Sequence, residues 1–355
     1  MRICLIASSR FPVREPFHGG LEAHTAMLAE NLIRRGHQVS VFAAPGSDPR
    51  LNVEELAVHR FEPSDAARRD VHAMPDLWMQ EHHAYLGLMM ELARTGPDRF
   101  DIVHNNSLHH LPVAMAELVD LPMVSTLHTP PVPWLESALV LAPDRSTFVA
   151  VSTHTATAWR HAVAAEVVLN GVDTARWRAG PGGGRAVWTG RIVPEKAPHL
   201  AVRAALEAGL SIDLAGPCQD EDYFAREIAP LLGPRVRHVG HLATDALVEL
   251  VGSAAVAVVS PAWDEPYGLV AAEAMSCGTP VAAFRRGALA EIVAPEAGAL
   301  AEPDDVGALA AAIDTARRAD RTLVREHAVR HHSVERMVAS YEDVYRRATT
   351  TKEAA

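Results

Sequence analysis

A strand, an acidic loop, a helix and a second strand follow one another between residues 256 and 284. Val256-Ala-Val-Val-Ser-Pro261 is a short apolar run, typical of a buried parallel strand. After Pro266 the apolar residues take helical spacing, and Gly278 and Pro280 supply the signals that end a helix. Val281 to Phe284 then forms a second strand. The stretch therefore predicts a βαβ-type unit, with its loop at the carboxyl end of a parallel strand, where open α/β sheets bind ligands.

The chemistry of this loop points to an anion with hydroxyl groups beside it. A helix beginning near Gly268 offers unpaired backbone N–H groups and the positive end of its dipole, which suit a phosphate. Glu265 and Glu273 bracket this position with seven residues between them. Carboxylates do not bind phosphate, so sugar hydroxyls are their natural ligands. Taken alone, the two glutamates are also compatible with an acid/base couple.

The same alternation of strands and helices runs through the whole chain. At 355 residues the chain exceeds what one core usually supports, so two domains are expected. The spacing of apolar residues loses its helix or strand period around residues 169–184. This stretch contains Ala179-Gly-Pro-Gly-Gly-Gly184, the segment of the chain with the most flexible composition. We predict an α/β protein with two Rossmann-like, doubly wound domains facing a cleft: residues 1–168, a linker at 169–184, and residues 185–333.

Individual elements follow from hydrophobic spacing and breakers. In the first half we expect strands at 3–7, 39–43, 101–104, 123–126 and 147–152, and helices at 21–35 and 76–94. In the second half we expect strands at 186–189, 212–215 and 236–239, and helices at 198–208, 221–232, 245–251, 304–318, 321–331 and 334–347. The helix at 76–94 fits core packing better than a membrane surface, because its polar face offers Glu81, His82 and Glu91 in place of basic residues.

Composition narrows the function. The net charge of −11 disfavours nucleic acid or an anionic membrane as the main partner. Cys4, Cys218 and Cys277 are scattered and lack Cys-x-x-Cys spacing, as expected of buried residues in a reducing compartment. No apolar segment has the length of a transmembrane helix. The apolar run at the amino terminus is shorter than that of a signal peptide. We expect a cytoplasmic protein.

Two cations follow the first strand of the second half. Arg191 and Lys196 lie in Gly190-Arg-Ile-Val-Pro-Glu-Lys196, at the edge of the sheet that faces the cleft. A diphosphate needs compensation of this kind. Only two lysines occur in the chain, and the other, Lys352, lies in the polar carboxyl-terminal tail. Because lysine is so scarce, we interpret Arg191 and Lys196 as functional residues and not as a pair of solvated surface cations.

Three further features are weaker taken singly. Gly19 and Gly20, between the first strand and helix, permit close backbone approach to a ligand but also occur in ordinary turns. His128 and His104 end strands and face either the cleft or the core. Asp220-Glu-Asp222 opens a predicted helix, which explains it as a complement to the helix dipole. No spacing supports a zinc site or a hydrolase triad.

Taken in order, these segments resemble the retaining glycosyltransferases of family 4, which have the GT-B fold. Glu265-Pro-Tyr-Gly-Leu-Val-Ala-Ala-Glu273 matches the E-x7-E motif of that family. Supporting matches cover nearly the whole chain, namely Gly19-Gly20-x-Glu22, Val151-Ser152, Asn170-Gly-Val-Asp173, Gly190-Arg191, Glu195-Lys196 and Leu214-Ala-Gly216.

The resemblance implies a hexosyltransferase that moves a sugar from a nucleotide sugar with retention at the anomeric carbon. It further implies a front-face mechanism, with no divalent metal and no other cofactor. UDP is the favoured nucleotide. The final helix, 334–348, is expected to pack back on the first domain, which would bind the acceptor, while residues 185–333 would bind the donor.

The resemblance also assigns roles. Arg191 and Lys196 would hold the diphosphate, with the backbone of Gly268, Leu269 and Val270 and the Gly19-Gly20 loop. Glu273 would bind the ribose, Glu265 the donor sugar, and His128 would contact that sugar near the reacting carbon. The base would stack near Leu242, and Gly216 and Tyr267 lie in donor-side matching segments. The residues with catalytic roles are thus His128, Glu265, Arg191 and Lys196, and the acceptor-side candidates are His18, His104 and His128.

The acceptor is expected to be small and soluble, such as a metabolite or natural-product scaffold, because arginine-rich first-domain elements typical of lipid-modifying relatives are missing. Two alternatives remain open at this point. A non-catalytic nucleotide-sugar sensor could keep Arg191, Lys196 and Glu273, and a nucleotide-sugar epimerase is another enzyme class to consider.

Overall fold

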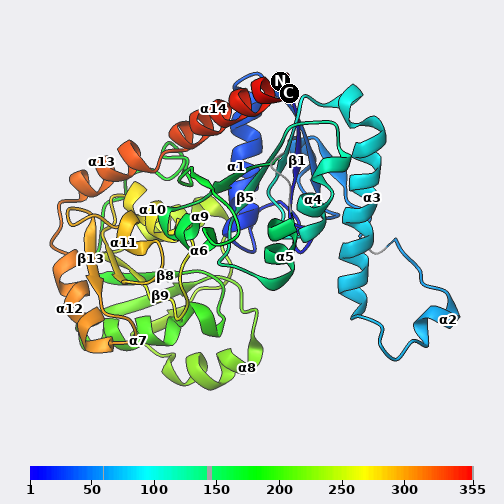
Figure 1. Cartoon of the computed structure of the whole chain (residues 1–355). Helices are drawn as coiled ribbons and strands as arrows, with labels where there is room; N and C mark the ends of the chain where they lie inside the picture. The colour runs from blue at the N-terminus through cyan, green and yellow to red at the C-terminus, as the bar shows by residue number, and fades with distance from the viewer. Residues whose placement is uncertain (59, 142–145, 354–355) are drawn as a thin grey trace.

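The computed structural model describes residues 1–58, 60–141 and 146–353. Two parallel sheets, one in each half of the chain, lie on opposite sides of the molecule in Figure 1. This confirms the predicted α/β class with two doubly wound sheets. Within the described residues, no helix combines the length and apolarity required to cross a bilayer.

The first sheet has seven strands in the order β3-β2-β1-β4-β5-β6-β7. Its central strands are short apolar runs that are buried on both faces, as parallel strands between helix layers must be. The strands are β1 (Arg2–Ile6), β2 (Gln38–Ala43), β3 (Val53–Glu55), β4 (Ile102–Asn105), β5 (Met123–Leu127), β6 (Ser146–Ala150) and β7 (Glu166–Val167). The helices are α1 (Gly20–Arg34), α2 (Asp65–Arg68), α3 (Asp76–Arg99), α4 (His110–Ala114), α5 (Pro133–Leu141) and α6 (Thr153–Trp159).

The second sheet has six strands in the order β10-β9-β8-β11-β12-β13. The strands are β8 (Arg185–Thr189), β9 (Ser211–Ala215), β10 (Val236–His238), β11 (Val256–Val259), β12 (Val281–Phe284) and β13 (Gly298–Ala301). The main helices are α7 (Pro198–Glu207), α9 (Thr244–Gly252), α10 (Leu269–Ser276), α11 (Leu289–Ile292), α12 (Val306–Ala316), α13 (Arg321–His331) and α14 (Val334–Glu353).

One predicted helix is wrong in kind. Residues 221–232 do not form a continuous α-helix but a single turn, α8 (Glu221–Tyr223), then a π-helical turn (Phe224–Ile228) and a 3-10 turn (Ala229–Leu231). Pro230 lacks an N–H group and its ring clashes with the carbonyl four residues earlier, so the regular helix cannot pass it. The short strands β3, β7 and β13 were not predicted, because their polar or glycine- and alanine-rich sequences carry little strand signal.

The two halves are joined by chain segments that lie side by side. Residues 168–184 contain no helix or strand apart from an isolated bridge between Val172 and Ser333. There, Val172 N–H donates to the His332 carbonyl at 2.7 Å and Val334 N–H donates to the Val172 carbonyl at 2.9 Å. From this crossing α14 runs across the top of Figure 1 and packs on α1 and β5 of the first sheet. The two chain segments that connect the halves, the linker and the segment leading into α14, are therefore hydrogen-bonded to each other.

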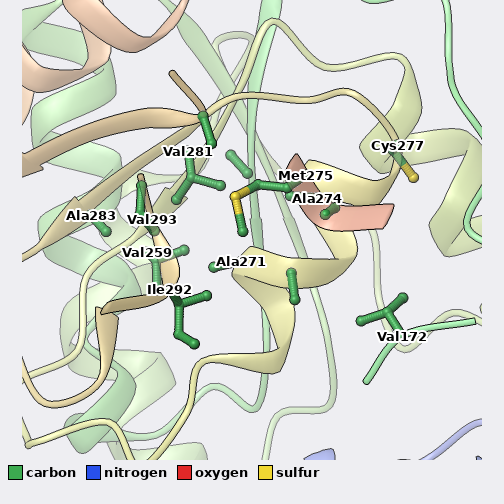
Figure 2. Close-up of a cluster of buried hydrophobic side chains, with 14 of the residues drawn as sticks. Val172, Val259, Ala271, Ala274, Met275, Cys277, Val281, Ala283, Ile292 and Val293 are labelled. Atoms are coloured by element: carbon green, nitrogen blue, oxygen red, sulfur yellow. The ribbon is translucent and has the colours of Figure 1, made fainter. Parts of the chain in front are cut away.

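Helix α10 is anchored in the apolar core of the second half. Its buried face consists largely of alanine, which lets the helix approach the sheet closely. Figure 2 shows Met275 pointing from α10 toward Val281, with Val259 and Ala271 nearby. This packing fixes the direction of the helix and hence the position of its amino-terminal end.

Candidate active site

The carboxyl-terminal edges of both sheets open on a shared cleft. A cavity with about 1090 Å³ of empty space, part of it open to solvent, is lined by residues that follow three adjacent strands, β9, β8 and β11; we call it the larger cavity. A neighbouring cavity with about 940 Å³ of empty space, also partly open to solvent, is lined by residues that follow β1, β4, β5 and β6 of the first sheet; we call it the smaller cavity. Both cavities contain Gly19, Gly20, Arg191, Lys196 and Glu265. Residues from distant parts of the chain thus meet where the topology predicts a ligand.

The amino-terminal end of α10 faces both cavities. Gly268 precedes the helix with φ +95°, a conformation that residues with a side chain rarely adopt, and an added Cβ would lie 2.7 Å from Leu289. Leu269 lines both cavities and Val270 lines the larger one. Ala271 N–H already donates to the Gly268 carbonyl at 2.9 Å. The N–H groups of Leu269 and Val270, at the start of the helix, have no carbonyl one turn earlier to bind and can therefore bind an anion.

Lys196 lies beside one of the two motif glutamates. Its Nζ donates to Glu265 Oε2 at 2.6 Å, and the two side chains retain only 23% and 13% of their exposure. Trp263 Nε1 donates to the same oxygen at 3.2 Å, and its ring lies 5.0 Å from the ammonium. An opposite charge and a second donor therefore hold the Glu265 carboxylate in the cleft as an acceptor.

Arg191 is held less tightly. Its Nη1 donates to Gln219 Oε1 at 2.8 Å, and its Nη2 lies 3.7 Å from Glu195. These contacts leave a guanidinium, lining both cavities, that is not committed to a bidentate partner. Such a group can turn toward an arriving anion.

Glu273 has a different environment from Glu265. It lines the larger cavity and the adjoining one that reaches Arg176 and Thr244. Burial raises its pKa from the ordinary value of 4.5 to about 8, because no cation offsets the loss of water. Glu265 is therefore paired with a cation, whereas the charge of an ionised Glu273 would have no cation beside it.

The glycine loop before α1 brings the two halves into contact. A Cβ on Gly19 would approach Glu22 Oε2 to 3.1 Å and Arg191 Nε to 4.0 Å, and one on Gly20 would lie 3.9 Å from Leu269. Glu22 is 5% exposed, and burial raises its pKa. The loop therefore lies within van der Waals distance of α10 and Arg191.

Gly216 is required by the neighbouring strand ends. It has φ +147°, and a Cβ there would lie 1.8 Å from the Gly190 carbonyl oxygen. The loops after β8 and β9 can therefore pass each other only with glycine at this position. Leu242 lies beside it in the larger cavity.

His128 follows β5 and lines the smaller cavity. Its Nε2 is hydrogen-bonded to Asn106 Oδ1 at 2.8 Å, and burial holds its pKa well below the usual value. The ring is therefore neutral at physiological pH, with Nε2 as the donor and Nδ1 as an acceptor. His24 packs edge-on against it at 4.9 Å.

Two candidate residues lie elsewhere than expected. His104 does not line the cleft cavities: it is fully buried, with Nδ1 2.6 Å from the Tyr345 hydroxyl and Nε2 2.8 Å from Thr126 Oγ1. A histidine whose two nitrogens are bonded under α14 is a structural residue, so the acceptor-side prediction for His104 is corrected. Tyr267 borders the smaller cavity, but its hydroxyl donates to the Asn170 carbonyl at 2.5 Å and so holds the linker.

His18 lines both cavities and stacks on Phe11, with ring centroids 4.6 Å apart.

The sequence did not predict a role for some of the neighbouring residues. Trp263 and Glu22 lie within or beside the matched segments but received no role, and His241 bonds the Phe17 carbonyl across the cleft at 2.9 Å. His241 carries no local signal, because its partner is 224 residues away.

Comparison with known proteins agrees with this geometry. The model of Glycosyltransferase Family 4 matches residues 18–176, and that of Glycosyl transferases group 1 matches residues 181–325. Glycogen synthase of Mycobacterium tuberculosis is 30% identical, over 88% of this chain and 85% of its own length. The chain belongs to the family 4 glycosyltransferases.

Two further similarities extend over the full length. D-inositol 3-phosphate glycosyltransferase of Acidothermus cellulolyticus is 30% identical over 100% of this chain and 93% of its own. The crystal structure of Anabaena Alr3699/HepE in complex with UDP and glucose superposes with a TM-score of 0.75 at 19% identity, covering 97% of this chain and 99% of that one. The two-sheet architecture is therefore the GT-B fold, and this family 4 member is a retaining hexosyltransferase that uses a nucleotide sugar.

Proposed function

We propose that this glycosyltransferase moves a hexosyl group from a UDP-sugar to a small soluble acceptor. The observation that carries the proposal is one cavity in which two cations, a free helix amino terminus and two unlike glutamates lie together. The complex of the HepE structure with UDP and glucose supports the choice of nucleotide. Residues 185–333 form the donor side and residues 1–168, with α14, form the acceptor side.

Arg191, Lys196 and the α10 amino terminus bind the diphosphate. Negative charge grows on the leaving phosphate as the glycosidic bond breaks, and cations fixed beside it stabilise the transition state. The Lys196 ammonium has three donors, so it can bind phosphate while it keeps Glu265. The Gly19-Gly20 loop closes the site from the other side.

The two motif glutamates take separate parts of the donor. Glu273, which lines the larger cavity, accepts hydrogen bonds from ribose hydroxyls, with the base near Leu242 and Gly216. Glu265 faces both cavities and accepts from hydroxyls of the transferred sugar. His128 contacts the same sugar from the first sheet, where its Nδ1 can accept a hydrogen bond from a sugar hydroxyl.

A front-face displacement fits these positions. The acceptor enters on the same face that the diphosphate leaves, and a phosphate oxygen takes the proton of the attacking hydroxyl. The residues described here supply charge, orientation and a closed cavity for this step, and the proposal assigns no step to a metal ion.

The acceptor side is the smaller cavity, where Ser8, Arg10, His18 and His128 offer polar groups. The named relatives act on glycogen and on D-inositol 3-phosphate, both rich in hydroxyl groups. A small polyhydroxylated acceptor suits the polar lining of this cavity.

A thermal-shift panel with UDP, GDP, ADP and dTDP tests the donor. A nucleotide that binds the folded chain raises Tm in proportion to its occupancy, so UDP is expected to give the largest shift. Hydrolysis or transfer of UDP-glucose in the presence of candidate polyols then tests turnover. A large UDP shift without turnover on any acceptor would favour a sensor, and a larger shift with another nucleotide would overturn the UDP assignment.

A further inference from the structure

Three histidines from two helices meet beside the acceptor half of the cleft. His82 lies on α3, His109 precedes α4 and His110 is its first residue. One nitrogen from each ring lies within 4.8 Å of the others, and all three side chains are half-buried. Among the described residues, this is the one group of three metal-ligand side chains so arranged.

Each of these imidazoles is stacked against an aromatic ring. Trp78 stacks on His82 at 5.3 Å, Tyr85 on His109 at 4.5 Å, and Trp134 on His110 at 5.5 Å. This stacking holds the planes of the rings. His109 and His110 also stack on each other, with ring centroids 4.4 Å apart, so binding one ion through both requires one of these two rings to turn. Ligands held by such packing lose less freedom when they bind an ion.

One of the nitrogens is left unpaired. His82 Nδ1 is buried and has no hydrogen-bond partner among the described residues. A buried polar atom without a partner costs free energy, so its retention calls for an explanation. An ion at the centre of the three rings would satisfy it.

We propose that His82, His109 and His110 bind one divalent transition-metal ion of the zinc type. Neutral imidazole suits zinc, copper and nickel, whereas magnesium and calcium prefer oxygen ligands. Bonds of about 2.0–2.1 Å require nitrogens roughly 3.4 Å apart in a tetrahedral site, so the nitrogens, now within 4.8 Å of one another, must approach by up to about 1.4 Å. Three protein ligands leave a position for water or for a substrate group.

The neighbouring charges are compatible with such an ion. Glu81 is not needed as a ligand, because it accepts from Ser9 Oγ at 3.0 Å and lies 3.9 Å from Arg10. The positive charge of Arg10 is thereby offset. Leu108, next to His109, lines the cavity that contains His128, so the metal site would adjoin the acceptor side without belonging to the donor site.

Binding has a defined structural consequence. His109 Nδ1 accepts the N–H of Leu111 at 3.2 Å, so in the metal-free protein its proton is on Nε2. A metal at Nε2 moves that proton to Nδ1, and a metal at Nδ1 takes the lone pair directly. In either case Leu111 N–H loses its acceptor.

The test uses the full chain without an affinity tag, stripped by a chelator and titrated with Zn²⁺ against a chromophoric competitor. We expect one tightly bound equivalent, a tetrahedral absorption spectrum with Co²⁺, and no uptake of Mg²⁺. Absence of stoichiometric Zn²⁺ binding would reduce the cluster to aromatic packing and overturn the proposal.

Matched variants locate the site. His82→Gln and His110→Gln should each weaken Zn²⁺ binding about tenfold or more, while His83→Gln should not, because His83 is the next residue on α3 but stacks on Phe61 instead. Retained UDP binding shows that each variant is folded. Equal Zn²⁺ affinity in His82→Gln, or equal loss in His83→Gln, would contradict the assignment.

A second readout reports on His109. In protein labelled with ¹⁵N-leucine, saturation with Zn²⁺ should shift the Leu111 amide resonance and speed its hydrogen exchange in the wild type but not in His82→Gln. An unchanged Leu111 amide in metal-loaded protein would mean that His109 is not a ligand.

Discussion

The two sides of the cleft are built differently. On the side of the second sheet, charges carry the site: Lys196 is paired with Glu265, Arg191 lies nearby, and α10 presents its amino-terminal end. On the side of the first sheet, the strand-end side chain is the half-buried, uncharged His128, and the cation Arg10 lies 3.9 Å from Glu81. One half is organised to hold anionic charge, and the other to orient hydroxyl groups.

This difference matches the needs of glycosyl transfer. The donor carries its negative charge on the diphosphate, whereas sugar and acceptor are neutral. Fixed cations on the acceptor side would compete with Lys196 for phosphate, and neutral groups on the donor side would leave the departing charge unstabilised. The contrast therefore predicts different kinetic signatures for substitutions on the two sides.

The largest effect is expected from the donor-side cations. Arg191→Ala and Lys196→Ala should each lower kcat about 10²–10³-fold, as when one charge-stabilising donor is removed from an active site. Steady-state kinetics measures the loss, with Arg203→Ala as a control, because Arg203 lies on α7 near Glu227 and outside the cleft. Near-normal rates in both variants would contradict the diphosphate assignment and remove the charge contrast.

Sequence reasoning was strongest where the site is local. Gly268, Leu269 and both motif glutamates fall within nine residues, and strand, loop and helix could be predicted around them from hydrophobic period and breakers. The GT-B fold followed because that pattern recurs along the whole chain. Regular elements with weak signals, such as β7 and β13, were not predictable, since only their neighbours make them strands.

Sequence reasoning failed where long-range packing decides. His104 and His128 both end strands of the first sheet, yet Tyr345 of α14 fixes one in the core and Asn106 holds the other at the cleft. The separation of 241 residues between His104 and Tyr345 cannot be read locally. The same holds for His82 and His109, which become neighbours only after α3 and α4 pack together.

Glu265→Gln separates binding of the donor sugar from binding of the nucleotide. The amide keeps the shape but loses the ion pair with Lys196, so we expect kcat to fall about tenfold or more, while the Kd of free UDP changes less than about threefold. Stopped-assay kinetics and calorimetric titration of UDP measure the two quantities. Parallel losses would show that Glu265 serves nucleotide binding or structure.

On the acceptor side, His128 and His104 form a matched pair. His128→Ala should lower kcat roughly tenfold with UDP affinity unchanged, because His128 lines only the smaller cavity. His104→Ala should leave kcat intact but lower the free energy of unfolding by about 1–3 kcal/mol, since Tyr345 and Thr126 lose a buried partner. Denaturant unfolding and kinetics on both variants distinguish these outcomes, and an active-site effect of His104→Ala would contradict its structural placement.

The smallest effect should come from Glu273, and its sign is opposite to that of the other substitutions. Its pKa is raised to about 8 in the folded chain and is near 4.5 when unfolded, so its contribution to stability is full below pH 4.5 and is lost as the pH rises toward 8. Glutamine cannot ionise. Glu273→Gln should therefore match the wild type near pH 5 and exceed it at pH 8.

The expected gain at pH 8 is roughly 1–2 kcal/mol, less than the pKa difference alone implies, because the half-buried side chain retains contact with water in the cavity. Thermal unfolding from pH 5 to 8 measures it, with Glu326→Gln, an exposed position on α13, as the control. Above pH 8, where Glu273 is ionised, the same variant should bind UDP more weakly than the wild type, since a ribose hydroxyl donates better to a carboxylate than to an amide. A gap in Tm that does not widen with pH would mean that Glu273 is compensated in solution, and the contrast between the paired and the unpaired glutamate would fail.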